Sequence, residues 1–121
     1  GIHCHNNKQL AFANTIAAII SGINYLDASL YGIGRGAGNC PLELLISFLK
    51  NPKFKVRPLV EAIEAEILPW TEKIDWGYYI PYMITGVLNQ HPRTAMAHME
   101  SDKKNKVTQF FDQMTSATEL G

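Results

Sequence analysis

The sequence has few cysteines, no excess of charge of either sign and no long apolar run. Two cysteines, Cys4 and Cys40, are too few for the disulfide framework of a small secreted domain, so a reducing cytoplasm is the expected compartment. Eleven basic residues balance eleven acidic ones, which leaves no basic surface for nucleic acid or an anionic membrane. The longest apolar stretch, residues 11–20, is too short to span a bilayer. We therefore expect neither a nucleic-acid partner nor a membrane.

The first half of the chain has the pattern of strands that alternate with helices. Residues 8–21 carry apolar side chains at every third or fourth position, which predicts a helix, and Gly22 stands where a C-cap belongs. Residues 23–30 form a short apolar segment between glycines, which predicts a buried strand. A glycine-rich loop follows, and Pro41 opens a further helix. This order predicts two parallel strands joined by a helix.

The second half has helical patterns only. They cover residues 58–74, 78–89, 92–100 and 103–119. Pro69 and Pro81 lie inside the first two segments, and we expect them to kink or divide those helices.

His3 and His5 are the first candidates for a functional site. Residues two apart in a strand point to the same face, so both imidazoles can reach one ion, whereas Cys4 faces away. Asn39 ends the glycine loop, and the carboxyl ends of neighbouring parallel strands share one face. Two imidazoles and an amide oxygen suit a borderline divalent ion such as Mn, Fe, Co or Zn and leave positions open for substrate. The alternative is a polar strand edge without a ligand.

The glycine loop has an alternative interpretation as a dinucleotide-binding turn. "GIGRGA", residues 32–37, fits the G-x-G-x-x-G/A fingerprint and stands between a strand and a helix. Against this, Asn39, Cys40 and Pro41 delay the helix, and no acidic residue at a strand end follows about twenty residues on. A phosphate loop of the Walker type is excluded, because no Gly-Lys-Ser/Thr follows.

The segments "GIHCHNN" and "AFANTIAAIISGINYLDASLYGIGRGAGNCPLE" closely resemble the last two strand-helix units of a superfamily of metal-dependent pyruvate-type aldolases and lyases. That superfamily includes 4-hydroxy-2-oxovalerate aldolase, HMG-CoA lyase and isopropylmalate synthase. The resemblance implies an α/β fold in which residues 1–50 are strands seven and eight of a TIM barrel with their helices, followed by a helical carboxyl-terminal domain at residues 51–121. It also implies that His3 and His5 bind a divalent metal and that Asn39 is a further ligand. Manganese is the expected ion, with Mg, Co and Zn as alternatives.

The resemblance implies a carbon–carbon lyase that cleaves a 4-hydroxy-2-oxo acid to pyruvate and an aldehyde through a metal-stabilised enolate. The superfamily's Asp ligand and general base come from earlier strands, which have no counterpart here. The chain is therefore interpreted as the carboxyl-terminal part of a longer enzyme and is expected to be inactive alone. Alternatives are an acyl-CoA-dependent 2-oxo acid synthase and a non-catalytic helical interaction module. Expected partners are a 2-oxo acid substrate, a dehydrogenase subunit and further copies of the chain.

The segment "WGYYIPYMITGVLNQHP" is similar to a helix that lines the substrate pocket with a Tyr in the 4-hydroxy-2-oxovalerate aldolases, and Tyr82 is the matching residue. The alternative is that Tyr78, Tyr79, Tyr82 and Met83 are packing residues, because aromatic side chains at helical spacing usually belong to a core.

Three further polar residues carry simpler predictions. Asp27 either orients a neighbouring ligand or ends a strand, and the sequence does not separate the two. His91 and His98 are expected to be surface or capping residues.

Overall fold

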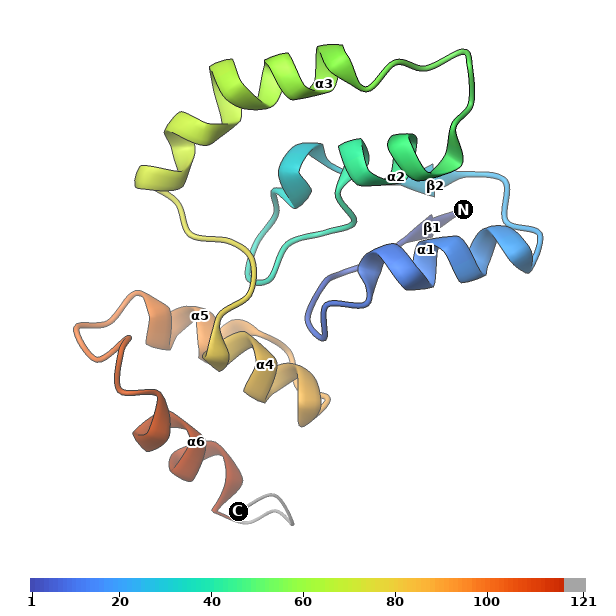
Figure 1. The fold of residues 1–121 in the computed structure, drawn as a ribbon. Helices are drawn as coiled ribbons and strands as arrows, with labels where there is room; N and C mark the ends of the chain where they lie inside the picture. Colours follow the sequence, from blue (N-terminus) through green and yellow to red (C-terminus); the bar gives the residue numbers. More distant parts are fainter. Residues whose placement is uncertain (117–121) are drawn as a thin grey trace. The chain divides into compact units, whose positions relative to one another are not determined.

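The chain forms two compact units that meet in sequence at Gly77 and Tyr78. The computed structural model describes residues 1–116 (Figure 1). The sequence predicts a barrel part at residues 1–50 and a helical region at residues 51–121. The boundary between the two compact units lies later in the chain than residue 50, and the assignment of the two domains stays a prediction. The compact first unit is longer because the Gly77 N–H donates to the Gly36 carbonyl at 3.1 Å, which ties residues 51–77 to the glycine loop.

The first unit contains a two-stranded parallel sheet, as the sequence predicts. Strand β1 is Ile2–His3 and strand β2 is Leu26–Asp27, and their register places Ile2 opposite Leu26 and His3 opposite Asp27. Helix α1, Ala11–Ile20, connects them. The second strand is much shorter than the predicted segment 23–30, because among residues 1–116 only the two-residue strand β1 pairs with it in a ladder, and Ser29 adds one isolated bridge to Pro41. The α/β class is therefore correct, whereas a TIM barrel stays a prediction.

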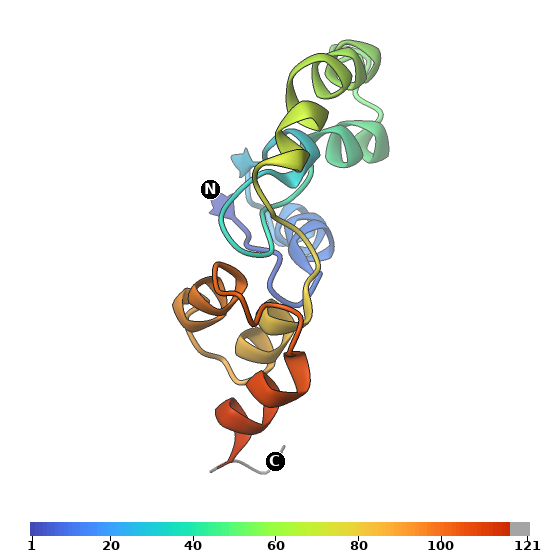
Figure 2. The same ribbon diagram turned by 90° about the vertical axis from the view of Figure 1, so that its left-hand side faces the viewer.

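Helices α1 and α2, Leu42–Leu49, lie on the same side of this sheet (Figure 2). Between them is a small core of Ala11, Cys40 and Leu45, with Cys4 packed against it. Cys4 therefore lies on the sheet's core side, as the alternation of side chains along a strand predicts. Pro41 is the N-cap of α2 and so opens this helix where expected.

Residues 57–72 form one continuous run of changing helix type. It begins as α3, Arg57–Ala62, widens into a π-helical turn η2, Ile63–Ile67, and tightens into a 3₁₀ segment η3, Leu68–Glu72. The change at Leu68 precedes Pro69, which has no N–H to continue the hydrogen-bond ladder. The predicted interruption at Pro69 is therefore confirmed.

The second unit consists of three short helices. They are α4, Ile80–Val87, α5, Arg93–Met99, and α6, Val107–Thr115. The predicted kink at Pro81 is wrong, because this proline occupies the first turn of α4, where its missing N–H has no intrahelical partner to lose. The predicted last helix, residues 103–119, begins later than expected, and its final residues lie outside the described part of the chain.

The two later histidines have different surroundings. The Nδ1 of His91 accepts the backbone N–H of Arg93 at 3.1 Å and so caps the start of α5, which confirms the capping prediction. His98 is half-buried, and its ring lies 4.5 Å from the Phe110 ring centroid. The expected surface position of His98 is therefore wrong, because the ring packs on the apolar face of α6. Within residues 1–116, no helix has the length and apolar character needed to cross a membrane.

Candidate metal centre

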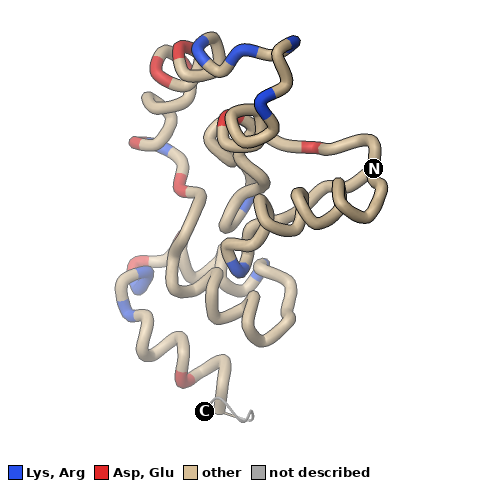
Figure 3. Tube along the Cα trace, turned by 45° about the vertical axis from the view of Figure 1, so that its right-hand side comes forward, with Lys and Arg blue, Asp and Glu red and all other residues tan. Residues whose placement is uncertain are grey.

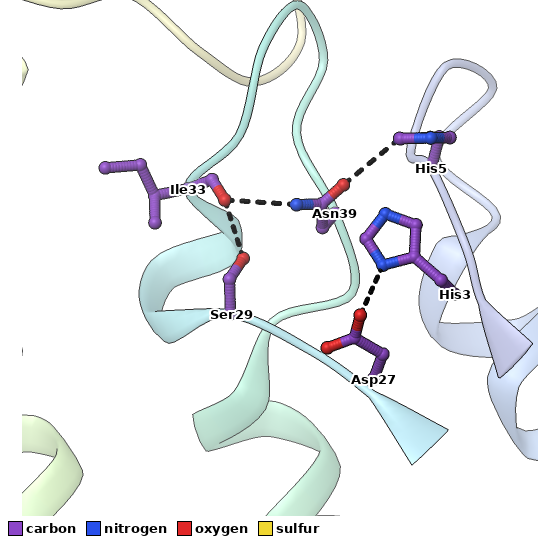
Figure 4. Close-up of polar contacts among 6 residues, drawn as sticks. All are labelled: His3, His5, Asp27, Ser29, Ile33 and Asn39. Carbon is purple, nitrogen blue, oxygen red and sulfur yellow. Dashed lines mark hydrogen bonds and ion pairs between the residues drawn. The ribbon is translucent and has the colours of Figure 1, made fainter. Parts of the chain in front are cut away.

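His3 lies beside Asp27 at the carboxyl end of the parallel strands. Their side chains point the same way because they are paired residues of neighbouring parallel strands. The His3 Nδ1 lies 2.7 Å from the Asp27 Oδ2 (Figure 4). The two side chains are 44% and 65% exposed, so the imidazole is open to solvent. Asp27 therefore both ends strand β2 and contacts a candidate ligand, so the structure is compatible with each of the two roles that the sequence leaves open.

His5 lies against Asn39, which is at the end of the glycine loop. The two residues form an isolated antiparallel bridge, and the His5 Nδ1 lies 3.1 Å from the Asn39 Oδ1. The Asn39 Nδ2 donates to the Ile33 carbonyl at 3.2 Å, and the Ser29 hydroxyl donates to the same carbonyl at 2.7 Å (Figure 4). Sequence reasoning missed Ser29, although its position after a strand end is a signal for such a contact.

These hydrogen bonds determine which nitrogen of each imidazole carries its proton. An ionised carboxylate only accepts, so the His3 Nδ1 is the donor. The Asn39 amide has its N–H₂ group on the Ile33 carbonyl, so its oxygen faces His5, and the His5 Nδ1 is also a donor. In the neutral form, both rings then keep the lone pair on Nε2. Metal-binding histidines commonly show this arrangement, with the second nitrogen bonded to a carboxylate or another acceptor.

The two rings are close neighbours. Their centroids are 4.8 Å apart and their planes are nearly perpendicular. The structure thus brings together His3, His5 and Asn39, as the sequence predicts, and adds Asp27 behind His3. Within residues 1–116, no three His, Cys, Asp or Glu side chains are placed to hold one ion. The imidazole pair fits a divalent metal as two of its ligands, and a complete coordination sphere needs oxygen ligands in addition.

The glycine loop holds Asn39 in place. The Asn39 N–H donates to the Gly32 carbonyl at 2.9 Å, and Gly32 has a left-handed φ of +66°. A Cβ at Gly34 would lie 2.6 Å from the Asn39 Nδ2, so only glycine leaves room for this amide. Tyr31 also adopts a left-handed φ of +55°, and its N–H donates to the Glu43 carboxylate at 2.6 Å. Glu43 thus stabilises an otherwise unfavourable backbone conformation.

A hollow of about 210 Å³ lies next to Asn39 in the first unit. Tyr31, Trp76, Asn6 and Asn39 are among the residues that line it, and none of its described lining residues is charged. Trp76, which sequence reasoning also missed, donates its indole N–H to the Tyr31 carbonyl at 3.1 Å. Charged residues are sparse along the first 49 residues (Figure 3); they are Lys8, Asp27, Arg35 and Glu43.

The two cysteines belong to the small core of the first unit. Burial raises the pKa of the Cys40 thiol, and a hydrogen bond with Thr15 opposes this only in part. Cys4 is half-buried. Because the thiolate is the reactive form, we expect iodoacetamide to label Cys4 well before Cys40 at pH 8 in the folded protein. Peptide mass spectrometry measures the two labelling rates, and equal rates would contradict the burial of Cys40.

Tyr82 belongs to the second unit. Its side chain is 4% exposed, and its ring meets that of Tyr79 edge to face with centroids 6.1 Å apart. It is therefore a packing residue of this unit, as the alternative interpretation expects, while Tyr78 is 59% exposed. A substrate contact by Tyr82 stays a prediction.

The chain is similar to several known proteins. Residues 1–67 match the HMGL-like family. A 4-hydroxy-2-oxovalerate aldolase from Thermus thermophilus is 47% identical over 68 residues, which are 53% of this chain and 20% of the relative. An oxaloacetate decarboxylase from Mycobacterium tuberculosis is 50% identical over 51 residues, which are 42% of this chain and 15% of the relative.

One solved structure is similar over most of the chain. It is the crystal structure of the N-terminal domain of a Bacteroides vulgatus protein assigned as an aldolase. The TM-score is 0.67 at 32% identity, and the match covers 89% of this chain and 36% of that one. The chain thus spans about a fifth of the length of the first curated relative. The match over residues 1–67 includes His3, His5, Asp27 and Asn39, and the chain belongs to the HMGL-like family of lyases and aldolases.

Proposed function

We propose that this chain supplies two metal ligands, His3 and His5, to a carbon–carbon lyase. The reaction is cleavage of a 4-hydroxy-2-oxo acid into pyruvate and an aldehyde. The observation that carries the proposal is the imidazole pair, whose Nδ1 atoms are both occupied by acceptors while both Nε2 atoms remain for a ligand bond. The names of the relatives support this reaction class.

Each residue has a separate role in this proposal. His3 and His5 hold the ion through Nε2, and Asn39 orients His5 while its second oxygen lone pair remains for a further ligand bond. A divalent ion, with manganese preferred, supplies Lewis-acid polarisation of the 2-oxo acid when bound. The uncharged hollow beside Asn39 suits the part of the substrate that leaves as the aldehyde. The general base and the remaining ligands come from the rest of the enzyme.

Several finer expectations belong to the same proposal. Residues 1–50 are the last two strand-helix units of a TIM barrel, and Tyr82 of the helical region that follows is a candidate substrate-binding residue. The protein acts in the cytoplasm, assembles with further copies of itself and pairs with a dehydrogenase. The 121-residue chain without its remaining strands binds metal weakly and does not turn over.

Removal of the metal tests the reaction class directly. We expect the whole protein to release pyruvate from 4-hydroxy-2-oxopentanoate, to lose this activity after dialysis against EDTA and to recover it with Mn²⁺, because two imidazoles alone provide no electrophile. A coupled assay with lactate dehydrogenase measures pyruvate after the chelator has been removed. Pyruvate release that persists unchanged in the metal-free protein would contradict the proposal.

A further inference from the structure

We infer that Asp27 is a positioning residue that fixes His3 as an Nε2 ligand. The inference rests on the proposed function, because it takes His3 as a ligand of the ion. It goes further in assigning a role to a carboxylate that itself contacts neither metal nor substrate. The role is to hold the proton of the neutral imidazole on Nδ1 and to set the angle of the ring.

The strand register places this carboxylate beside the imidazole. Asp27 is opposite His3 in the parallel pair, and residues opposite one another in such a pair point to the same face. A shift of the register by one residue would turn Asp27 to the other face. The 2.7 Å separation of the Asp27 Oδ2 and the His3 Nδ1 is that of a short, charge-assisted hydrogen bond. The contact therefore follows from the backbone pairing.

No other acidic residue among the first 49 is available for this task. The only other one is Glu43, and both of its oxygens accept the Tyr31 N–H, at 2.6 and 3.2 Å. His5 obtains the same tautomer from the neutral Asn39 amide. The two candidate ligands are thus oriented by different acceptors, a carboxylate oxygen for His3 and an amide oxygen for His5.

A purely structural role for Asp27 does not explain the contact. The Asp27 side chain is 65% exposed and that of His3 is 44% exposed, and exposed pairs of this kind contribute little to stability. Loss of the carboxylate should therefore leave the unfolding temperature nearly unchanged. Its effect should instead appear in the affinity for the metal and in the tautomer of His3.

The test compares Asp27→Ala, Asp27→Asn and the control Asp75→Ala in the whole protein. Asp75 is an exposed carboxylate of the same unit. Calorimetry measures Mn²⁺ affinity, and nitrogen NMR of the metal-free, histidine-labelled protein reports which His3 nitrogen carries the proton. We expect Asp27→Ala to weaken Mn²⁺ binding about 10- to 100-fold and to move the His3 proton toward Nε2. Asp27→Asn, which keeps an acceptor oxygen, should lie between Asp27→Ala and the native protein, and Asp75→Ala should match the native protein.

The outcomes separate this inference from the proposed function. If Asp27→Ala keeps both the native Mn²⁺ affinity and the Nδ1–H tautomer, Asp27 has no positioning role, even though the metal site stands. If the native protein fails to bind Mn²⁺, the proposed function fails, and Asp27 as a positioner of a metal ligand fails with it. Both are supported if Asp27→Ala weakens Mn²⁺ binding and moves the His3 proton away from Nδ1, Asp27→Asn is intermediate, and Asp75→Ala changes neither.

Discussion

Replacement of His3 or His5 by alanine is expected to lower metal-dependent pyruvate release by the whole protein more than about 100-fold. Loss of a group that merely orients a ligand costs about 10- to 100-fold, and loss of the ligand itself should cost more. Both rings offer Nε2 from one small region, with centroids 4.8 Å apart, and within residues 1–116 no third His, Cys, Asp or Glu side chain joins them, so each variant removes one of two donors. Steady-state kinetics at saturating Mn²⁺ measure the loss.

A matched control separates this effect from the loss of any histidine. His91 caps helix α5 in the second unit, and its replacement by alanine should leave pyruvate release within about twofold, because an exposed cap contributes roughly 1 kcal/mol to local stability. The double variant His3→Ala/His5→Ala should be little worse than either single variant, since groups that act as a unit are strongly non-additive. Full activity in either single variant would remove both residues from the metal site.

The convergence of the site residues could be predicted because it depends on simple periodicities. His3 and His5 are two residues apart, and a strand places such residues on one face. Asn39 follows the next parallel strand, whose carboxyl end is at the same edge of the sheet. The structure places Asn39 within 3.1 Å of His5, and it packs Cys4 on the core side. These periodicities do not show that the side chains bind a metal, because a complete coordination sphere needs further ligands. Metal ligation therefore stays a prediction.

The role of Asp27 could not be derived from sequence in the same way. To predict the contact between His3 and Asp27, one must know the register of two strands that a whole helix separates in the sequence. The alternation of side chains along a strand predicts only which face of the sheet each residue is on. The register is set by backbone pairing, such as the bond from the Ile2 N–H to the Tyr25 carbonyl at 2.9 Å. The extent of the first unit depends likewise on long-range contacts, such as the bond from the Gly77 N–H to the Gly36 carbonyl. Neither bond has a local signature in the sequence.

Helix ends were predicted better than strand lengths, for a physical reason. Gly22 and Pro41 act locally, through a left-handed φ of +93° and a fixed φ at the N-cap, so they mark the helices in any context. A strand exists only where a neighbour completes its ladder. Residues 23–30 have one short partner strand among the described residues, so the ladder is limited to Leu26–Asp27, with one isolated bridge from Ser29 to Pro41.

Substitution of Gly38 by alanine is expected to destabilise the first unit by about 3 kcal/mol. Gly38 has a φ of +85°, which costs a side-chain-bearing residue about 1–2 kcal/mol. In addition, its Cβ would lie 2.3 Å from the Gly32 carbonyl oxygen, a backbone atom that cannot rotate away, and overpacking of this kind costs about 1–3 kcal/mol. Urea unfolding followed by far-ultraviolet circular dichroism measures the free energy of unfolding.

Gly22→Ala is the control that isolates the clash. Gly22 has a comparable φ of +93°, but a Cβ there meets no atom within 4 Å, so alanine should cost only the conformational part, about 1–2 kcal/mol. Gly38→Ala should also weaken Mn²⁺ binding, because the Gly32 carbonyl that it displaces accepts the Asn39 N–H at 2.9 Å, and Asn39 orients His5. Equal losses of stability in the two variants would mean that the loop relaxes without strain, and the site would then tolerate a side chain at Gly38.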